Sequence, residues 1–559
     1  MSTMIGHLDS IAEVCLADSA KLSDGVLQRF LRELFGRPAM DSLEKLSLAR
    51  CRGAGSKAMP LLVGLLVESN GLYKLRNLDI SGIRISSSTM TSLCRAVHLH
   101  PAIRSLHLQD TGLGMHPTAA QCLEELLNAP SMEVLGLGWN CFSEEALRAL
   151  GDMLASHKRL RELYMANCDS CQRSEGKSST HRFLEGLYRN SSLKMLDISM
   201  NRLTHKSALI IEDSLAKHAK LQELYIGQNP LGKHGLRCLL RLLSLPSCGL
   251  RRLEALGCQG ADAQELSSFQ ATEPTGYHTL DLNLAHGRSL LRLLYKTCES
   301  LRLDLKEAFQ RASYVVSERQ IPFPHPSGKD GNGVYPVPIT GVFSFFFCID
   351  AARRRLAPTE GLEGRFRGPR PVGSIYLDQH FALLRRKLTL KKVVPLLSQF
   401  KSLKGRPDEQ KLILDALSAD FALDYECLAM LCQESFNSID ALCHLMPGVC
   451  RSQMRLFLAL THLPRLREYL KVYKRCERLL LFNADCPTGR YALNMSVPSD
   501  YAVAEMLKML DAWEASMAKE AGLQDRSQYG NWSSVRNCTY LNQSLLSLTD
   551  WTAYLEARI

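Results

Sequence analysis

The sequence predicts an α/β solenoid over residues 43–290, followed by a mainly α-helical C-terminal region. Two observations support this prediction. The first is an apolar pattern, L-x-x-L-x-L-x-x-N/C, whose copies recur mostly every 28 or 29 residues. The second is a run of apolar residues at helical spacing between one copy and the next. A unit of this kind cannot bury its apolar side alone, so successive units must stack into a curved array.

Each copy of the pattern predicts a short strand with a buried central leucine, because alternate side chains of a strand point to opposite sides. The leucines expected to form one buried column are Leu46, Leu78, Leu106, Leu135, Leu163, Leu196 and Leu224. The Asn or Cys in the ninth place turns the chain inward and bonds the turn backbone. Ile83 and Thr111 depart from this rule. The copies begin at residues 43, 75, 103, 132, 160, 193, 221 and 250, with a degenerate last copy at Tyr277.

The segment after each strand is expected to be helical. Ser143 precedes a helix over residues 144–155, and Thr204 precedes one over residues 205–218. Serine and threonine are favoured at the residue before a helix, where the hydroxyl accepts a bond from a free backbone N–H. Strand, turn and helix therefore alternate within every unit.

This pattern resembles the ribonuclease-inhibitor-like leucine-rich repeats, whose units of 28 or 29 residues alternate strand and helix. The resemblance covers about residues 43–290. It implies a horseshoe with a parallel sheet on its concave face and a role in binding other macromolecules. It does not identify the partner.

The exposed strand positions supply candidate binding residues. Aromatic residues and arginines are enriched at the energetic centres of protein interfaces, and Tyr164 and Tyr225 occupy the same place two repeats apart. The alternative is that these are ordinary surface residues. The candidates for binding a protein are Arg104, His107, Trp139, Arg161, Tyr164 and Tyr225.

The chain is expected to divide into five parts. Residues 1–42 are an N-terminal helical cap, and residues 43–290 are the repeat solenoid. Residues 291–350 are a C-terminal cap and a linker rich in Pro and Gly, residues 351–480 a basic and mainly helical domain, and residues 481–559 a small mixed α/β module.

Positive charge is concentrated in residues 353–406. This segment holds fourteen Lys or Arg and three Asp or Glu, so its net charge of +11 equals that of the whole chain. One interpretation is a solvated helix face with a basic loop. The other is a surface for an acidic protein, nucleic acid or membrane. The main candidates are Arg353, Arg354, Arg355, Arg365, Arg367, Arg370, Arg385, Arg386 and Lys387.

Three short motifs lie near the C-terminus, beginning at Leu481, Pro498 and Ser527. They resemble those of an uncharacterised helical module found in large protist proteins, over roughly residues 390–559. The resemblance implies no activity.

No pattern in the sequence indicates an enzyme. The phosphate-binding, dinucleotide-binding, serine-hydrolase and metalloprotease motifs are missing. We therefore expect no catalysis, no cofactor, no metal site and no small-molecule substrate. The nineteen cysteines are expected to be reduced, because their number is odd and no export signal is recognisable.

The sequence therefore predicts a non-catalytic scaffold or adaptor that binds protein partners in a large intracellular assembly. The favoured setting is the ciliary axoneme or microtubule cytoskeleton, with tubulin or axonemal proteins as partners. The alternative is an RNA-containing assembly, such as a divergent ribosome, bound through residues 353–406. A cytoplasmic location is expected, with the cilium or flagellum included, and no insertion into a membrane, since no apolar run approaches the roughly 20 residues that a span requires.

Overall fold

The computed structural model of the chain divides into two compact units. Unit 1 comprises residues 1–230 and 245–259, and unit 2 comprises residues 231–244 and 260–559. The structure describes residues 11–19, 22–35, 42–51, 53, 55–67, 72–169, 180–245, 247–258, 271, 274–331, 333–349, 351–352, 385–389, 391–393, 400–401, 403, 405–449, 452–463, 465–484, 487, 489–520, 539–540 and 543–544.

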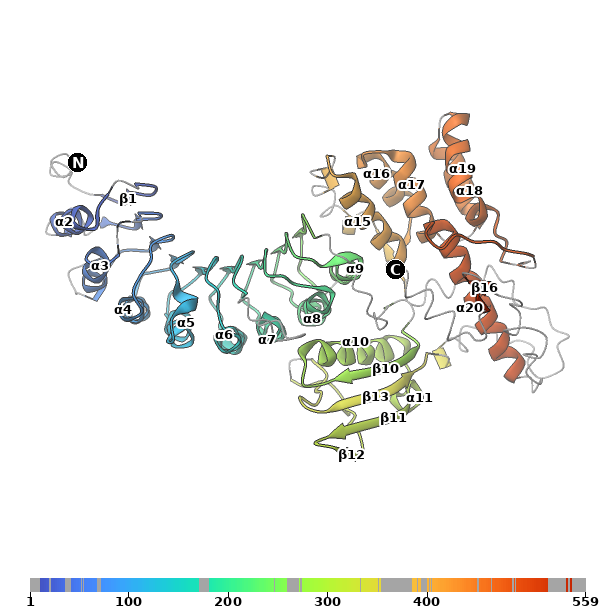
Figure 1. The fold of residues 1–559 in the computed structure, drawn as a ribbon, viewed down its shortest axis with the longest axis horizontal. Coiled ribbons are helices and arrows are strands. Elements are labelled where there is room, and N and C mark those ends of the chain that lie inside the picture. Colours follow the sequence, from blue (N-terminus) through green and yellow to red (C-terminus); the bar gives the residue numbers. More distant parts are fainter. Residues whose placement is uncertain are drawn as a thin grey trace. The chain divides into compact units, whose positions relative to one another are not determined.

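Unit 1 is built on a parallel sheet that has nine strands among the described residues. Their order in the sheet is their order in the chain, and they lie along the inner side of a curve (Figure 1). The strands are β1 (Glu13–Cys15), β2 (Lys45–Ser47), β3 (Asn77–Asp79), β4 (Ser105–His107), β5 (Val134–Gly136), β6 (Glu162–Tyr164), β7 (Met195–Asp197), β8 (Glu223–Tyr225) and β9 (Arg252–Glu254).

The register of this sheet confirms the predicted leucine column. Leu46 pairs with Leu78, and the pairing of central leucines continues through Leu224 and Leu253. From Leu46 to Leu224 each is at most 1% exposed. Burying a leucine side chain contributes roughly 1.5–3 kcal/mol, so the column is a main source of stability in unit 1.

The sheet also extends into the segment that was expected to be only a helical cap. β1 pairs with β2 in the parallel register of the later strands. The signal is present in the sequence, because Ile11, Val14 and Leu16 repeat the apolar spacing of the other copies, and Ile11 and Leu16 are buried.

Helices cover the outer side of the curve (Figure 1). Two of the predicted caps are present: Ser143 Oγ accepts from the Ala146 N–H at 3.2 Å, and Thr204 and Ser207 form a capping box in which the Thr204 N–H also donates to Ser207 Oγ at 3.2 Å. The helices are α2 (Asp24–Phe35), α3 (Ala58–Val67), α4 (Ser87–Leu99), α5 (Ala119–Leu127), α6 (Glu144–Ser156), α7 (Thr180–Gly186) and α8 (His205–Leu215), with 3-10 turns at Leu113–Met115 and Leu187–Arg189.

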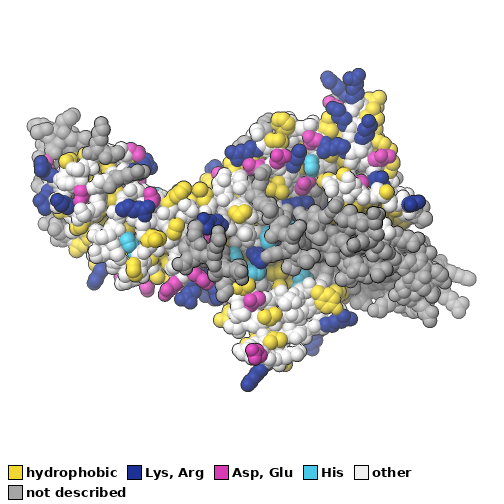
Figure 2. Space-filling view, viewed as in Figure 1, with side chains coloured by type: hydrophobic (Ala, Val, Ile, Leu, Met, Phe, Trp, Pro, Cys, Tyr) yellow, Lys and Arg dark blue, Asp and Glu magenta, His cyan; other side chains and the backbone are white. Residues whose placement is uncertain are grey.

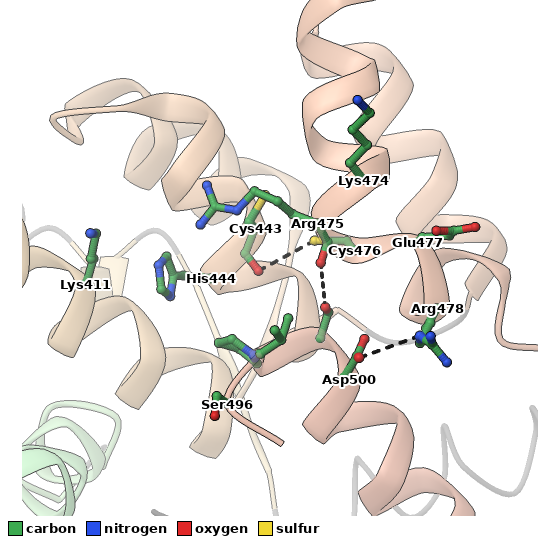
Figure 3. Close-up of a pocket in the computed structure, with 13 residues that line it drawn as sticks. Lys411, Cys443, His444, Lys474, Arg475, Cys476, Glu477, Arg478, Ser496 and Asp500 are labelled. Carbon is green, nitrogen blue, oxygen red and sulfur yellow. Dashed lines mark hydrogen bonds and ion pairs between the residues drawn. The ribbon is translucent and has the colours of Figure 1, made fainter. Parts of the chain in front are cut away.

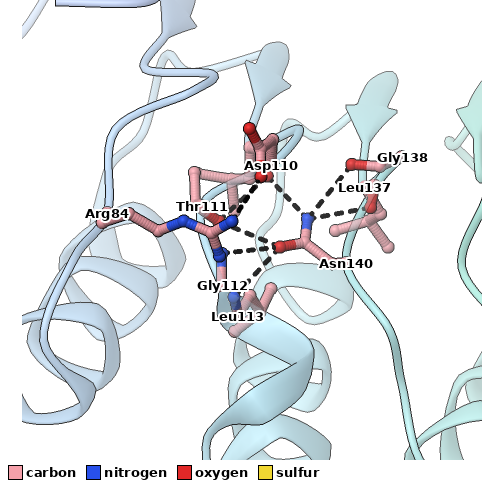
Figure 4. Close-up of polar contacts among 9 residues, drawn as sticks. Arg84, Asp110, Thr111, Gly112, Leu113, Leu137, Gly138 and Asn140 are labelled. Atoms are coloured by element: carbon pink, nitrogen blue, oxygen red, sulfur yellow. Dashed lines mark hydrogen bonds and ion pairs between the residues drawn. The ribbon is translucent and has the colours of Figure 1, made fainter. Parts of the chain in front are cut away.

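Buried asparagines in the ninth place join each turn to the preceding repeat. Asn140 Oδ1 accepts from the N–H groups of Gly112 and Leu113 at 2.9 and 3.0 Å (Figure 4). Its Nδ2 donates to the carbonyls of Leu108 and Leu137 at 2.7 and 2.9 Å. Asn201 and Asn229 make equivalent bonds. Where the ninth place holds a cysteine, as at Cys168, the thiol donates to a carbonyl of the preceding repeat.

The first part of unit 2 is a small α+β fold. Its described strands form a sheet in the order β10-β13-β11-β12, with antiparallel neighbours. The predicted loop rich in Pro and Gly lies between β12 and β13. The elements are β10 (Gly276–Asp281), α10 (Ala285–Leu301), α11 (Leu305–Ala308), β11 (Phe309–Val316), β12 (Arg319–Ile321) and β13 (Val342–Phe347).

This sheet corrects the prediction of a last repeat at Tyr277. Tyr277 lies in β10 and pairs with Phe346 of β13, so it does not continue the parallel sheet. The reason is that the aromatic strand β13 supplies a different partner: Phe343 and Phe345 are buried in one apolar cluster with Leu291 of α10. β10 is therefore held by a core that belongs to unit 2.

The rest of unit 2 is mainly helical, as predicted. The elements are α9 (Gly232–Leu243), β14 (Arg386–Leu388), α15 (Pro407–Asp420), β15 (Phe421–Leu423), α16 (Tyr425–Glu434), α17 (Ser438–Leu445), a 3-10 turn (Met446–Gly448), α18 (Ser452–His462), α19 (Leu466–Leu481), α20 (Pro498–Glu520), β16 (Thr539–Tyr540) and β17 (Gln543–Ser544).

A buried ion pair attaches α9 to this helical part. Arg237 donates to both carboxylate oxygens of Asp420 at 2.8 and 2.7 Å, and Arg241 donates to one of them at 2.9 Å. Burial opposes ionisation of the carboxyl, but the two guanidinium groups outweigh it and hold the pKa of Asp420 well below its usual range. The helix that follows β8 in the chain is thereby part of unit 2. Within the described residues, no helix is both long and apolar enough to cross a membrane.

Candidate functional site

The exposed side of the solenoid sheet carries two rows of side chains, which flank the buried leucine column. We call them the first row, before each leucine, and the second row, after it. The strand register aligns neighbouring members of each row. From β6 to β9 the first row is Glu162, Met195, Glu223 and Arg252, and the second row is Tyr164, Asp197, Tyr225 and Glu254.

The two tyrosines of the second row are fixed by carboxylates of the first. Tyr164 Oη donates to Glu162 Oε2 at 3.0 Å, and Tyr225 Oη donates to Glu223 Oε2 at 2.6 Å. Partial burial and the adjacent carboxylate raise the pKa of each tyrosine to about 12. Both hydroxyls therefore stay protonated near neutral pH. The Arg252 guanidinium lies 5.1 Å from the ring centroid of Tyr225, within the range of a cation–π contact.

His107 approaches Tyr164 because the strand between them carries a glycine. His107, Gly136 and Tyr164 are aligned on β4, β5 and β6, and the two ring centroids are 6.1 Å apart. A Cβ atom on Gly136 would lie 2.6 Å from His107 Nδ1. Gly136 thus permits the imidazole to lie across β5.

The two predicted arginines, Arg104 and Arg161, are brought together by an acidic residue. Glu133 lies between them on the neighbouring repeat, and each guanidinium is 3.7 Å from a Glu133 carboxylate oxygen. These pairs are largely exposed, so they orient the side chains more than they stabilise the fold.

Trp139 lies in the turn directly before Asn140, the ninth place of its repeat, and outside the two rows. Its side chain is 52% exposed and its φ is 63°. The equivalent turn residues Asp110, Asn167 and Gln228 share this left-handed backbone. A bulky residue is uncommon in that conformation. The left-handed backbone at Trp139 therefore has a conformational free-energy cost, and it places the indole in solvent.

The carboxylates that orient the predicted residues are not among the candidates predicted from the sequence. Glu162 and Glu223 each precede a predicted tyrosine by two residues, in the tripeptide Glu-Leu-Tyr. Side chains two apart in a strand share a face, so the spacing alone could have identified them.

The basic candidates fall into two groups. Arg353, Arg354, Arg355, Arg365, Arg367 and Arg370 lie outside the described residues. Arg385, Arg386 and Lys387 are described, and only Lys387 is exposed.

Arg385 and Arg386 correct the prediction of a free basic surface at this point. Arg385 donates to the carbonyl of Ser418 at 2.9 Å, and Arg386 donates to the carbonyl of Arg241 at 2.8 Å. The reason is that β14 pairs with β15, which follows α15 directly. Both guanidinium groups therefore bind the chain's own backbone.

Unit 2 contains a cavity of about 590 Å³ between α15, α17, α19 and the start of α20. Its charged side chains largely pair with acidic neighbours. Arg478 lies 3.6 Å from Asp500 (Figure 3), and His444 lies 2.6 Å from Asp415. In the part of the chain that the structure describes, no three His, Cys, Asp or Glu side chains gather as metal ligands would.

Comparisons with known proteins find repeat proteins. Ribonuclease inhibitor of Mus musculus is 28% identical over 278 residues, which are 45% of this chain and 59% of that protein. Ribonuclease inhibitor of Sus scrofa is 30% identical over 286 residues, which are 46% of this chain and 61% of that protein. The NACHT, LRR and PYD domains-containing protein 12 of Homo sapiens is 27% identical over 289 residues, which are 45% of this chain and 26% of that protein.

This chain therefore spans about three fifths or less of the length of these relatives. No protein-family model matches it. The similarity of residues 390–559 to a protist module is not confirmed by these comparisons.

Proposed function

This chain belongs to the leucine-rich-repeat family, and we propose that it is a non-catalytic scaffold that binds a protein partner through the concave face of unit 1. The observation that carries the proposal is the arrangement of Tyr164, Asp197 and Tyr225 on adjacent strands, with both hydroxyls fixed by carboxylates. The mouse and pig relatives are named for inhibiting a ribonuclease, which suggests a protein partner here as well.

The candidate binding side chains are preorganised. A side chain that is already held in one conformation loses little entropy when a partner binds. Tyr164, Tyr225, Arg104 and Arg161 are each oriented by a carboxylate before binding. The exposed Trp139 adds a large apolar side chain beside these rows, and tryptophan, tyrosine and arginine dominate interface energetics.

The proposal is tested by comparing two variants of the full chain. The double variant Tyr164→Ala, Tyr225→Ala should lose the proteins that copurify with the parent from its own cells, while its melting temperature stays unchanged. Arg148→Glu, an exposed change on the outer helix α6, is the matched control and should retain them. Identical sets of copurifying proteins from both variants would contradict the proposal.

The arginines at 353–370 are proposed as a second, electrostatic contact with an acidic surface. Exposed charges are screened beyond about 8 Å at physiological salt, so this contact should weaken as ionic strength rises. The ciliary and RNA-containing settings have no support among the relatives, and the proposal does not include them.

A further inference from the structure

Helix α19 buries one side within unit 2 and exposes three leucines along the border of that side. Val472, Cys476, Leu479 and Leu480 are buried within unit 2. Three other leucines of the helix are exposed, Leu466 by 74%, Leu470 by 47% and Leu481 by 58%. At 3.6 residues per turn these three lie within a sector of about 60°. We call them the leucine stripe.

A row of cations runs beside the leucine stripe. Arg467, Lys471 and Lys474 follow one another at spacings of four and three residues, and all are exposed. None of the three has an ion pair with a described residue. The neighbouring Arg475 and Arg478, by contrast, are paired with Asp440 and Asp500. Lys474 is also among the residues that line the cavity of unit 2 (Figure 3).

Apolar and cationic side chains are thus presented together on one helix. Figure 2 shows Lys and Arg side chains beside hydrophobic ones over this part of unit 2. Covering the leucines would release water from apolar surface, and cations that form no ion pair with the described residues favour an anionic partner. We propose that α19 is a docking surface for an acidic amphipathic helix of a partner protein. In this arrangement the partner's apolar residues contact the leucine stripe, and its acidic residues pair with Arg467, Lys471 and Lys474.

The composition of the stripe favours a helix over an anionic membrane. Glu477 is exposed and projects within the sector of the leucine stripe. A carboxylate at that place is costly to bury in the apolar layer of a membrane, whereas at the edge of a contact between two helices it can stay hydrated. A helix that lies in a membrane interface has a wide apolar face, whereas this stripe is about one side chain wide. Residues four apart on a partner helix match the spacing of Arg467 and Lys471.

The test uses the full chain and a designed peptide of 21 residues. The peptide carries leucine at the a and d positions and glutamate at the e and g positions of three heptads. Its glutamates oppose self-association. Fluorescence anisotropy measures binding to the parent, to the charge-reversal variant Arg467→Glu, Lys471→Glu, Lys474→Glu, and to the variant Leu466→Ser, Leu470→Ser. The matched control is Arg148→Glu, Lys158→Glu, Lys220→Glu, which reverses three exposed charges in unit 1.

The expected result is binding to the parent and the control, and affinity at least about tenfold weaker for both α19 variants, whose melting temperatures remain those of the parent. A peptide with lysine in place of glutamate should not bind. Failure of the parent to bind the acidic peptide, or equal binding by the charge-reversal variant, would overturn the proposal. Binding of vesicles containing phosphatidylserine without binding of the peptide would also overturn it, in favour of a membrane.

Discussion

Both units bury polar side chains, and the best-defined contacts of this kind differ between them. Unit 1 repeats one neutral solution: Asn140, Asn201 and Asn229 each bond the turn backbone of an adjacent repeat. Unit 2 contains a charged contact in which Asp420 binds Arg237 and Arg241, 183 and 179 residues away. The neutral contacts are local and replaceable by a similar group, as Cys168 illustrates. The charged contact is long-range, and its parts cannot be removed one at a time without leaving a buried charge.

The solenoid predicts the largest effect at its leucine column. Leu163→Asp should cost roughly 4–5 kcal/mol or more, because an unpaired charge would replace a fully buried side chain. Neighbouring repeats should unfold with it, since each repeat is stabilised by the next. Denaturant unfolding and hydrogen exchange measure this. The exposed change Arg148→Asp is the control, and a Leu163→Asp chain that melts like the parent would show the register to be wrong.

The helical part of unit 2 should be most sensitive at Asp420. Asp420→Ala should destabilise unit 2 by about 3–5 kcal/mol, because it leaves two arginines buried without their counter-ion. Calorimetry should show the change in unit 2 and leave the transition of unit 1 in place. Asp408→Ala, on the same helix but 84% exposed, should have little effect. An equal loss in both units would contradict the division drawn between them.

The same contact makes unit 2 sensitive to acid in a defined direction. The pKa of Asp420 is lower in the folded chain than the value of about 3.9 expected for an unfolded aspartate. Above the unfolded pKa, the contribution of Asp420 to the free energy of unfolding is complete. It is lost as the pH falls from the unfolded pKa toward the folded pKa. Urea unfolding of the parent and of Asp420→Ala should differ most at pH 6 and converge in acid. A difference that stays constant down to pH 3 and below would exclude this role.

Substitution of an asparagine in the ninth place of a repeat should lower stability by less, and more locally. Asn140→Ala should cost about 2–3 kcal/mol, because buried N–H and C=O groups of two repeats lose their partner. Cys168→Ala removes a single weak thiol bond and should cost less. Comparison of the two melting curves separates the amide's contribution from that of simple packing. Equal losses would mean that packing alone stabilises the turn.

The site was only partly predictable from the sequence. Tyr164 and Tyr225 follow from strand alternation, because the repeat fixes which positions are exposed. Glu133 was missed because its role depends on Arg104 and Arg161 in the repeats on either side. The concentration of positive charge in residues 353–406 predicts Arg386 in a surface for an anionic partner, but its environment is set by a carbonyl 145 residues away.

The sequence by itself determined the solenoid, since each unit's strand, turn and helix depend on residues within about 30 positions and on neighbours of the same pattern. It therefore contained the leucine column, the asparagines in the ninth place and the exposed rows. Tertiary structure alone decided that Tyr277 joins an antiparallel sheet with β13 and that α9 is tied to Asp420. Both depend on partners far along the chain, and no local pattern specifies which distant strand or carboxylate a segment will meet.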